Sequence, residues 1–244
     1  MMSIYIKFIR YFLNFFDFFS QKKIINYFNF QFKKKEIVFF DVGAHFGETV
    51  YLFSKYLKVK QFHCFEASPR NFEILKKKIE NSNYSNICHL NNFGLGHKSY
   101  DTFINQTKES SSSTINNINF NSSYFKKKIK ILNISKIDSY VEKIPIKVTF
   151  LDHYINQNKI QLIDILKIDT EGFEFEVLKG LTKNFKKVKF IYFEHHYDDM
   201  IKKNYIFSDI HNLLEKNNFK KTMKSKMIFR KSFEYIYENM LLNS

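Results

Sequence analysis

Three short blocks of the sequence carry most of the residues that could perform chemistry. They are Asp41-Val-Gly43-Ala-His-Phe-Gly47, Phe93-Gly94-Leu-Gly96 and Asp169-Thr-Glu-Gly172. Each block directly follows an apolar run that is typical of a strand. Glycine allows a positive φ and a close approach of the backbone to a ligand, and open α/β sheets bind ligands at the carboxyl ends of their strands. We therefore expect these blocks to border a ligand site.

The first block joins a predicted strand to a predicted helix, so its backbone N–H groups and the helix N-terminus could hold an anionic group. Its glycines have the spacing G-x-x-x-G, whereas a dinucleotide site requires G-x-G-x-x-G, because a pyrophosphate approaches the middle glycine closely. The bulky pair His45-Phe46 would also obstruct a pyrophosphate. The block therefore favours a cofactor that presents only an amino-acid carboxylate at this point.

Glu66 stands at the end of the second predicted strand. An acidic side chain at that place can accept hydrogen bonds from both hydroxyls of a ribose. A carboxylate that caps the following helix is the alternative interpretation. We favour ribose binding, because a glycine loop and a strand-end acid occur together in folds that bind nucleoside cofactors.

The elements that would position these residues alternate between strands and helices, as in a doubly wound sheet. Long apolar runs predict strands, and Ser68-Pro69 supplies a helix N-cap and a first-turn proline. Residues 98–147, which include Ser110-Ser-Ser-Ser113, predict loop and edge structure over the sheet. The predicted strands are residues 36–41, 61–67, 86–92, 146–150, 162–169, 188–193, 223–229 and 233–237. The predicted helices are residues 48–58 and 208–216, with others beginning near residues 68, 151 and 175.

The length predicts one large domain, residues 36–244, preceded by an amphipathic helical extension, residues 1–35. Residues 1–23 carry a polar stripe along one helix face, formed by Lys7, Arg10, Asn14, Asp17 and Gln21. A helix packed on the domain is the favoured interpretation, and a helix that associates weakly with a membrane surface is the alternative. Charges within the apolar part argue against a spanning helix or a signal peptide.

The formal net charge of +15 is compatible with nucleic acid or an anionic membrane as a partner. However, the lysines occur in short runs at predicted element ends, where solvated surface is the simpler interpretation. We therefore expect no nucleic-acid partner. Cys64 and Cys88 lie in separate predicted strands, without metal-ligand or redox spacing. They suit reduced thiols in the cytoplasm.

At these blocks the chain resembles the FkbM family of class I S-adenosylmethionine-dependent methyltransferases, from about residue 37 to residue 194. The last of the matching blocks is the most specific, because so long a fixed string rarely arises by chance. The chain departs from the usual family pattern at His45, where Asn is common, and at Ala67, where Pro is common. The matching blocks are Asp41-Val-Gly-Ala-His-Phe-Gly-Glu-Thr49, Phe65-Glu-Ala-Ser-Pro69, Gly94-Leu-Gly96, Val148-Thr-Phe-Leu-Asp152 and Leu166-Lys-Ile-Asp-Thr-Glu-Gly-Phe-Glu-Phe-Glu-Val-Leu-Lys-Gly180.

The resemblance implies a Rossmann-like α/β fold, with a mostly parallel seven-stranded sheet and helices on both faces. It also implies S-adenosylmethionine as the cofactor. The methyl group of the cofactor would lie beside Asp169. The methionine part would lie against Asp41, Gly43, Ala44, His45 and Gly47. The ribose and adenine would lie against Glu66, Ala67, Asn92, Phe93 and Gly94.

We expect methyl transfer to a hydroxyl of a small molecule or glycan, and the sugar-type acceptor rests on the resemblance alone. This reaction requires an oriented acceptor, exclusion of water and help in removing a proton. Asp169, Glu194 and His195 end adjacent predicted strands and are the expected catalytic residues. Binding of the cofactor amine is the alternative role for Asp169, while Glu171 is interpreted as a helix cap and His196 as a surface residue. We predict no metal, because the sequence shows no Cys/His cluster at structural-metal spacing.

Two other classes remain as alternatives. A nicotinamide-dependent oxidoreductase of Rossmann type is disfavoured by the missing middle glycine of the first block. A non-catalytic basic module could bind RNA or an anionic membrane through its lysines. That interpretation gives no reason for a glycine loop, Glu66 and Asp169 to stand at successive strand ends.

Overall fold

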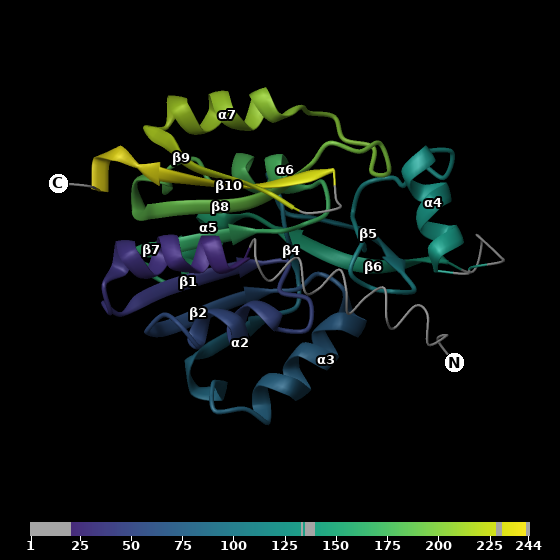
Figure 1. The fold of residues 1–244 in the computed structure, drawn as a ribbon. Helices are drawn as coiled ribbons and strands as arrows, with labels where there is room; N and C mark the ends of the chain where they lie inside the picture. Colours follow the sequence, from purple (N-terminus) through teal and green to yellow (C-terminus); the bar gives the residue numbers. More distant parts are fainter. Residues whose placement is uncertain (1–20, 133, 135–139, 228–230, 243–244) are drawn as a thin grey trace.

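The computed structural model describes residues 21–132, 134, 140–227 and 231–242. Figure 1 shows one large sheet with helices along both of its faces, and a smaller sheet beside it with α4 (Ser123–Ile131) nearby. Within the described residues, the large sheet has seven strands in the order β3-β2-β1-β7-β8-β10-β9, and the small sheet has the order β4-β6-β5.

The large sheet is mostly parallel. Its strands β3, β2, β1, β7 and β8 pair in parallel, whereas β10 runs antiparallel to both β8 and β9. This confirms the predicted Rossmann-like α/β fold. The strand order reverses beside β1, which is where open α/β sheets bind ligands. The strands are β1 (Ile37–Val42), β2 (Val59–Phe65), β3 (Cys88–Asn91), β7 (Ile163–Ile168), β8 (Val188–His196), β9 (Phe219–Lys226) and β10 (Ser232–Asn239).

Different helices cover the two faces of the sheet. Because successive residues of a strand point to opposite faces, neighbouring residues pack against different helices. Phe39 of β1 packs in the cluster formed with helical residues 21–32, α2 (Glu48–Ser54) and α3 (Pro69–Glu80). Phe40 packs in the opposite cluster, which includes residues of α5 (Leu151–Gln157), α6 (Glu174–Lys179) and α7 (Phe207–Lys216). Burial of each such aromatic side chain contributes on the order of 2 kcal/mol. Short 3-10 helices are η1 (Ser85–Ile87), η3 (Phe185–Lys187) and η4 (Met240–Leu242).

The helix at residues 21–32 is part of the core. Its residues Phe28 and Phe32 are buried, and their ring centroids lie 5.7 and 5.6 Å from that of Phe190 on β8. The predicted polar stripe before Gln21 falls outside the described residues. Among the residues that the structure describes, no helix has the length and hydrophobicity needed to cross a membrane.

The segment predicted as loop and edge structure contains two long strands of the small sheet. Here β5 (Tyr100–Thr107) and β6 (Val141–Thr149) pair antiparallel, and β4 (Gly94–Leu95) adds a short parallel neighbour to β6. The sequence predicts only the second part of β6, as a strand at residues 146–150, because Pro145 interrupts the pattern before it. Pro145 pairs with Phe103 of β5 on one edge of β6. On the other edge β4 pairs only with Val148 and Thr149, so the proline interrupts no hydrogen bonds to β4.

Candidate active site

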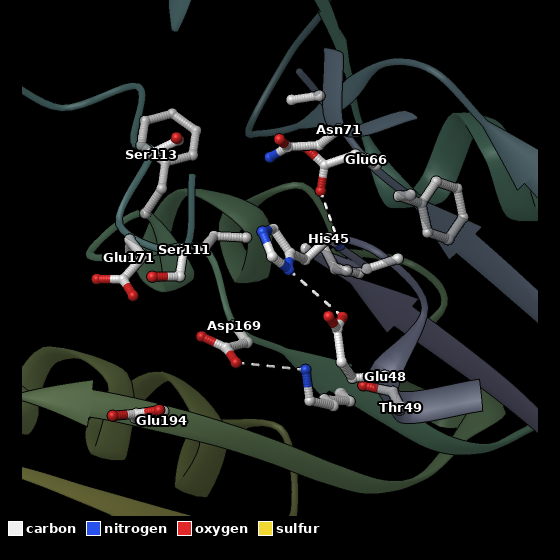
Figure 2. A pocket seen from close by; sticks show the side chains of 18 of the residues that line it. His45, Glu48, Thr49, Glu66, Asn71, Ser111, Ser113, Asp169, Glu171 and Glu194 are labelled. Carbon is white, nitrogen blue, oxygen red and sulfur yellow. Dashed lines mark hydrogen bonds and ion pairs between the residues drawn. The ribbon is translucent and has the colours of Figure 1, made fainter. Parts of the chain in front are cut away.

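A cavity of about 540 Å³ opens where β1, β2 and β7 end (Figure 2). This volume is within the range of small-molecule sites in proteins. Most of the predicted site residues line the cavity, as expected for side chains at the carboxyl ends of parallel strands. These lining residues are Gly43, Ala44, His45, Glu66, Ala67, Phe93, Gly94, Asp169 and Glu194.

Gly43 allows the loop after β1 to touch the turn after β7. Its φ is +86°, and a Cβ atom at this position would lie 1.9 Å from the carbonyl oxygen of Asp169. No side chain fits at that distance, and L-residues rarely adopt that φ. The glycine is therefore required to bring the two turns together.

The backbone N–H groups of the first loop do not form the predicted cradle for an anion. Gly43 and Ala44 donate to the carbonyl oxygen of Phe65, at 2.9 and 3.0 Å. His45 donates to Glu66 Oε2 at 2.8 Å, and the N–H of Phe46 donates to Glu48. The loop thus uses these donors to fix its own shape and to hold Glu66.

Three predicted cofactor residues support the cavity from behind and do not line it. Asp41 is buried beneath Lys167, and Asn92 donates from its side chain to the carbonyl oxygen of Glu66 at 2.9 Å. Gly47, with φ +86°, packs against α3, where a Cβ would lie 2.9 Å from Leu75 Cδ1. Their effect on a ligand is therefore indirect.

Glu66 is buried at the cavity wall with both carboxylate oxygens fixed. Oε2 accepts the hydrogen bond from His45, while Oε1 accepts from the Ser68 backbone N–H at 2.9 Å and from the Asn71 side chain at 3.4 Å. Burial raises the pKa of Glu66 to about 7, although these hydrogen bonds oppose the shift. The bond to Ser68 shows that Glu66 also supports the N-terminus of α3, so the two predicted roles are compatible.

Lys167 is a site residue that the sequence analysis missed. Its Nζ lies 3.2 Å from Asp41 Oδ1 and 3.4 Å from Asp169 Oδ2, and the side chain lines the cavity. Burial alone would lower the pKa of Lys167, but the two carboxylates raise it well above its usual value. The available signal was the spacing, since Lys167 and Asp169 are two residues apart and share one side of an extended segment.

His196 is held among carboxylates and is not a surface residue. Its Nε2 lies 3.4 Å from Glu194 Oε1 and 3.6 Å from Glu171 Oε2, and its Nδ1 lies 3.6 Å from Asp198 Oδ2. Burial alone would lower the pKa of His196, but Glu194 and Glu171 raise it to about 10. The side chain is therefore an imidazolium at neutral pH.

Within the described residues, no group of three or more His, Cys, Asp or Glu side chains is arranged to hold a metal ion.

His195 does not lie with Asp169 and Glu194. It is 3% exposed and packs against the rings of Tyr197, Tyr205 and Phe207, away from the cavity. Burial lowers its pKa to about 3. The prediction of His195 as a catalytic residue is corrected by strand geometry, because its side chain points to the opposite face from its neighbours in β8.

The polar tract after β5 covers the cavity. Ser110, Ser111 and Ser113 line it together with Thr114, and Ser110 Oγ lies 2.7 Å from His45 Nε2. Figure 2 shows Ser111 and Ser113 on the side of the cavity that also holds Glu171. These two residues thus lie at the part of the site away from Glu66, while Ser110 contacts His45.

The family model described as Methyltransferase FkbM domain matches residues 41–221, which include Glu66, Asp169 and the residues between them. The chain belongs to the FkbM methyltransferase family. This confirms the resemblance found in the sequence, and it supports methyl transfer over hydride transfer or non-catalytic binding. Comparison with curated proteins gave no match.

Solved methyltransferase structures share the fold of this FkbM family member. The FkbM methyltransferase from Methylobacillus flagellatus KT matches with a TM-score of 0.54 and 14% identity, over 84% of this chain and 44% of that chain. The METTL16 MTase domain matches with a TM-score of 0.53 and 12% identity, over 89% of this chain and 66% of that chain. The present chain therefore spans less than half the length of the first structure. At these identities the likeness shows the fold alone.

Proposed function

We propose that this protein transfers the methyl group of S-adenosylmethionine to a hydroxyl group of a sugar, a glycan or another small molecule. The observation that carries the proposal is the shared cavity of Glu66 and the acidic residues Asp169, Glu171 and Glu194. Figure 2 shows Glu66 on one side of His45 and the three acids on the other. The cavity thus offers a nucleoside-type side and an acceptor side.

The residues of the cavity fit the proposed cofactor. Glu66 is a fixed strand-end carboxylate that could accept the two ribose hydroxyls. Ala67, Phe93 and Gly94 supply apolar surface suited to adenine, and Asp169 could pair with the amino group of the methionine part. When bound, S-adenosylmethionine supplies an electrophilic methyl group on a sulfonium.

The charges of the cavity favour an acceptor without negative charge. Its acidic lining residues are Glu48, Glu66, Asp169, Glu171 and Glu194, against one lysine among the described lining residues, Lys167. This differs from the net charge of the chain, +15. Carboxylates repel phosphate or carboxylate groups, whereas serine and threonine hydroxyls can bond to a polyol. The lining therefore supports a neutral, hydroxyl-rich acceptor and argues against nucleic acid in this cavity.

Two steps test the proposal. Calorimetry should first detect saturable binding of S-adenosylhomocysteine. The same measurement should detect no binding of a nicotinamide dinucleotide. Tritium should then pass from methyl-labelled S-adenosylmethionine to members of a panel of neutral methyl glycosides and oligosaccharides. Transfer to RNA or to amines, with no transfer to the glycosides, would contradict the proposed acceptor class.

Cys64 and Cys88 are free thiols. Reduced thiols are typical of the cytoplasm, so they support a cytoplasmic location as part of the same proposal.

A further inference from the structure

Glu171 adopts a backbone conformation that few residues other than glycine adopt. Its φ is +51°, and that of Gly172 is +92°. Contacts from outside the turn hold this conformation: Thr114 Oγ1 donates to the carbonyl oxygen of Glu171 at 2.8 Å, and Glu174 Oε1 accepts from the Gly172 N–H at 2.9 Å. Strained backbone that the surroundings enforce in this way clusters at functional sites. Here it aims a carboxylate into the cavity.

The side chain of Glu171 lies at the acceptor side of the cavity (Figure 2). It is 16% exposed, and its Oε2 lies 3.6 Å from Nε2 of His196. Burial raises the pKa of Glu171 to about 7, and the His196 imidazolium opposes that shift. The other charged groups that act on Glu171 are Asp169, Glu194, Lys128 and Lys203.

The neighbouring acids lie slightly closer to their cations than Glu171 does. Asp169 lies 3.4 Å from Nζ of Lys167, which ties it to the cation shared with Asp41. Glu194 Oε1 lies 3.4 Å from Nε2 of His196, the cation that Glu194 shares with Glu171, and the Glu194 side chain is 12% exposed. His195 lies on the opposite face of the sheet and is excluded by position. Of these three carboxylates, Glu171 has the longest distance to its cation, and its backbone carbonyl oxygen accepts the hydrogen bond from Thr114, which follows the serines.

We propose that Glu171 is the general base of the reaction and that His196 is a positioning residue that orients Glu171 and Glu194. This inference rests on the proposed transfer to a hydroxyl. As the acceptor oxygen bonds to the methyl carbon and the sulfur–carbon bond breaks, the carboxylate of Glu171 takes the hydroxyl proton. The products are a methyl ether, S-adenosylhomocysteine and a protonated Glu171, which returns its proton to water.

The first test compares Glu171→Gln, Glu171→Asp and the control Glu142→Gln, in which the exposed partner of Arg70 is changed. A positioned base typically contributes a hundredfold to ten-thousandfold, so kcat of Glu171→Gln should fall by at least about a hundredfold. Glu171→Asp should recover part of the loss, and Glu142→Gln should match the wild type. Affinity for S-adenosylhomocysteine should stay within about twofold in all three variants.

The second test has two parts, and the first part needs no acceptor. Histidine-selective ¹⁵N NMR of the ligand-free protein should show the pKa of His196 falling in Glu171→Gln, because a carboxylate that raises it is lost. In His196→Gln, the rise of kcat with pH should move to higher pH, because the cation that favours ionised Glu171 is absent. A purely structural His196 would leave the midpoint of that profile in place.

The outcomes separate the two proposals. If the wild type forms a methyl ether and Glu171→Gln keeps its kcat, the base assignment is overturned and the O-methyl transfer stands. If the wild type methylates only nitrogen or carbon, the proposed function fails and the base role fails with it. An unchanged pKa of His196 in Glu171→Gln would overturn the positioning role.

Discussion

A Cβ atom at Gly43 would lie 1.9 Å from the carbonyl oxygen of Asp169. The loop after β1 and the turn after β7 are thus in backbone contact at the base of the cavity. This contact sets the distance between the part of the site near Glu66 and the part near Glu171. A change at Gly43 must separate the two turns.

We therefore expect Gly43→Ala to destabilise the fold by about 2 kcal/mol or more, since it combines a positive φ with a steric clash. Binding of S-adenosylhomocysteine should be lost in the same variant. Urea unfolding and calorimetry measure the two effects, with Glu80→Ala at the exposed end of α3 as a control. Unchanged stability and affinity in Gly43→Ala would show that the turns are not in contact.

Glu66→Ala should weaken cofactor binding while the domain stays folded. A hydrogen bond to a charged group contributes about 1.5–3 kcal/mol, so the affinity should fall by about tenfold to a hundredfold. Calorimetric titration with S-adenosylmethionine, and circular dichroism to verify folding, provide the measurement. An affinity equal to that of the wild type would remove Glu66 from the site.

His195→Phe should leave catalysis intact. The side chain packs in an aromatic cluster outside the cavity, so another, somewhat larger aromatic ring should cost at most about 1–3 kcal/mol of stability. We expect kcat and its pH profile to match the wild type within about twofold. A hundredfold loss of kcat with unchanged stability would restore His195 as a catalytic residue.

The sequence predicts those parts of the site that depend on local position. Gly43, Glu66 and Asp169 follow apolar runs, and the ends of parallel strands meet at one edge of a sheet, so their proximity was predictable. The faces of His195 and His196 were not predictable, and the sequence analysis placed His195 in the site and His196 on the surface, because a one-residue difference in register reverses the face to which a side chain points. That register is set by the pairing of β8 with β10, in which His195 lies opposite Phe233, far away in the sequence.

The cover of the cavity was predicted less well, for a related reason. The antiparallel pairing of β5 with β6 joins Tyr100 to Val148 and Thr107 to Val141. Partners at such a separation leave no local pattern, and Pro145 masks the part of β6 that precedes residue 146. The contact of Ser110 with His45 depends on this pairing, so the serines could be predicted as a cover but not as lining residues.

The contribution of His196 to the free energy of unfolding should decrease as the pH rises. Burial alone would lower its pKa, but Glu194 and Glu171 raise it from the ordinary 6.5 to about 10 in the folded protein. The stabilisation is therefore fully present below about pH 6.5 and is lost as the pH rises through about 10. His196→Gln should be less stable than the wild type by about 2–4 kcal/mol near neutral pH, and the difference should shrink at about pH 10.

Urea unfolding across this pH range measures the difference, with His153→Gln as a control at an exposed position. A difference that is constant with pH would show that His196 has the same pKa in the folded and unfolded chains. A difference that grows with rising pH would reverse the sign of the argument and contradict the ion pairs of His196.

The position of the transferred methyl group tests the central claim most directly. The protein is incubated with S-adenosylmethionine carrying a ¹³C-labelled methyl group and with the neutral glycosides described above, and the product is examined by ¹³C NMR. We predict a labelled methyl ether on a sugar hydroxyl, formed together with an equal amount of S-adenosylhomocysteine. Label found only on nitrogen or carbon, or label that passes to RNA in a parallel incubation while the glycosides stay unlabelled, would contradict the proposal.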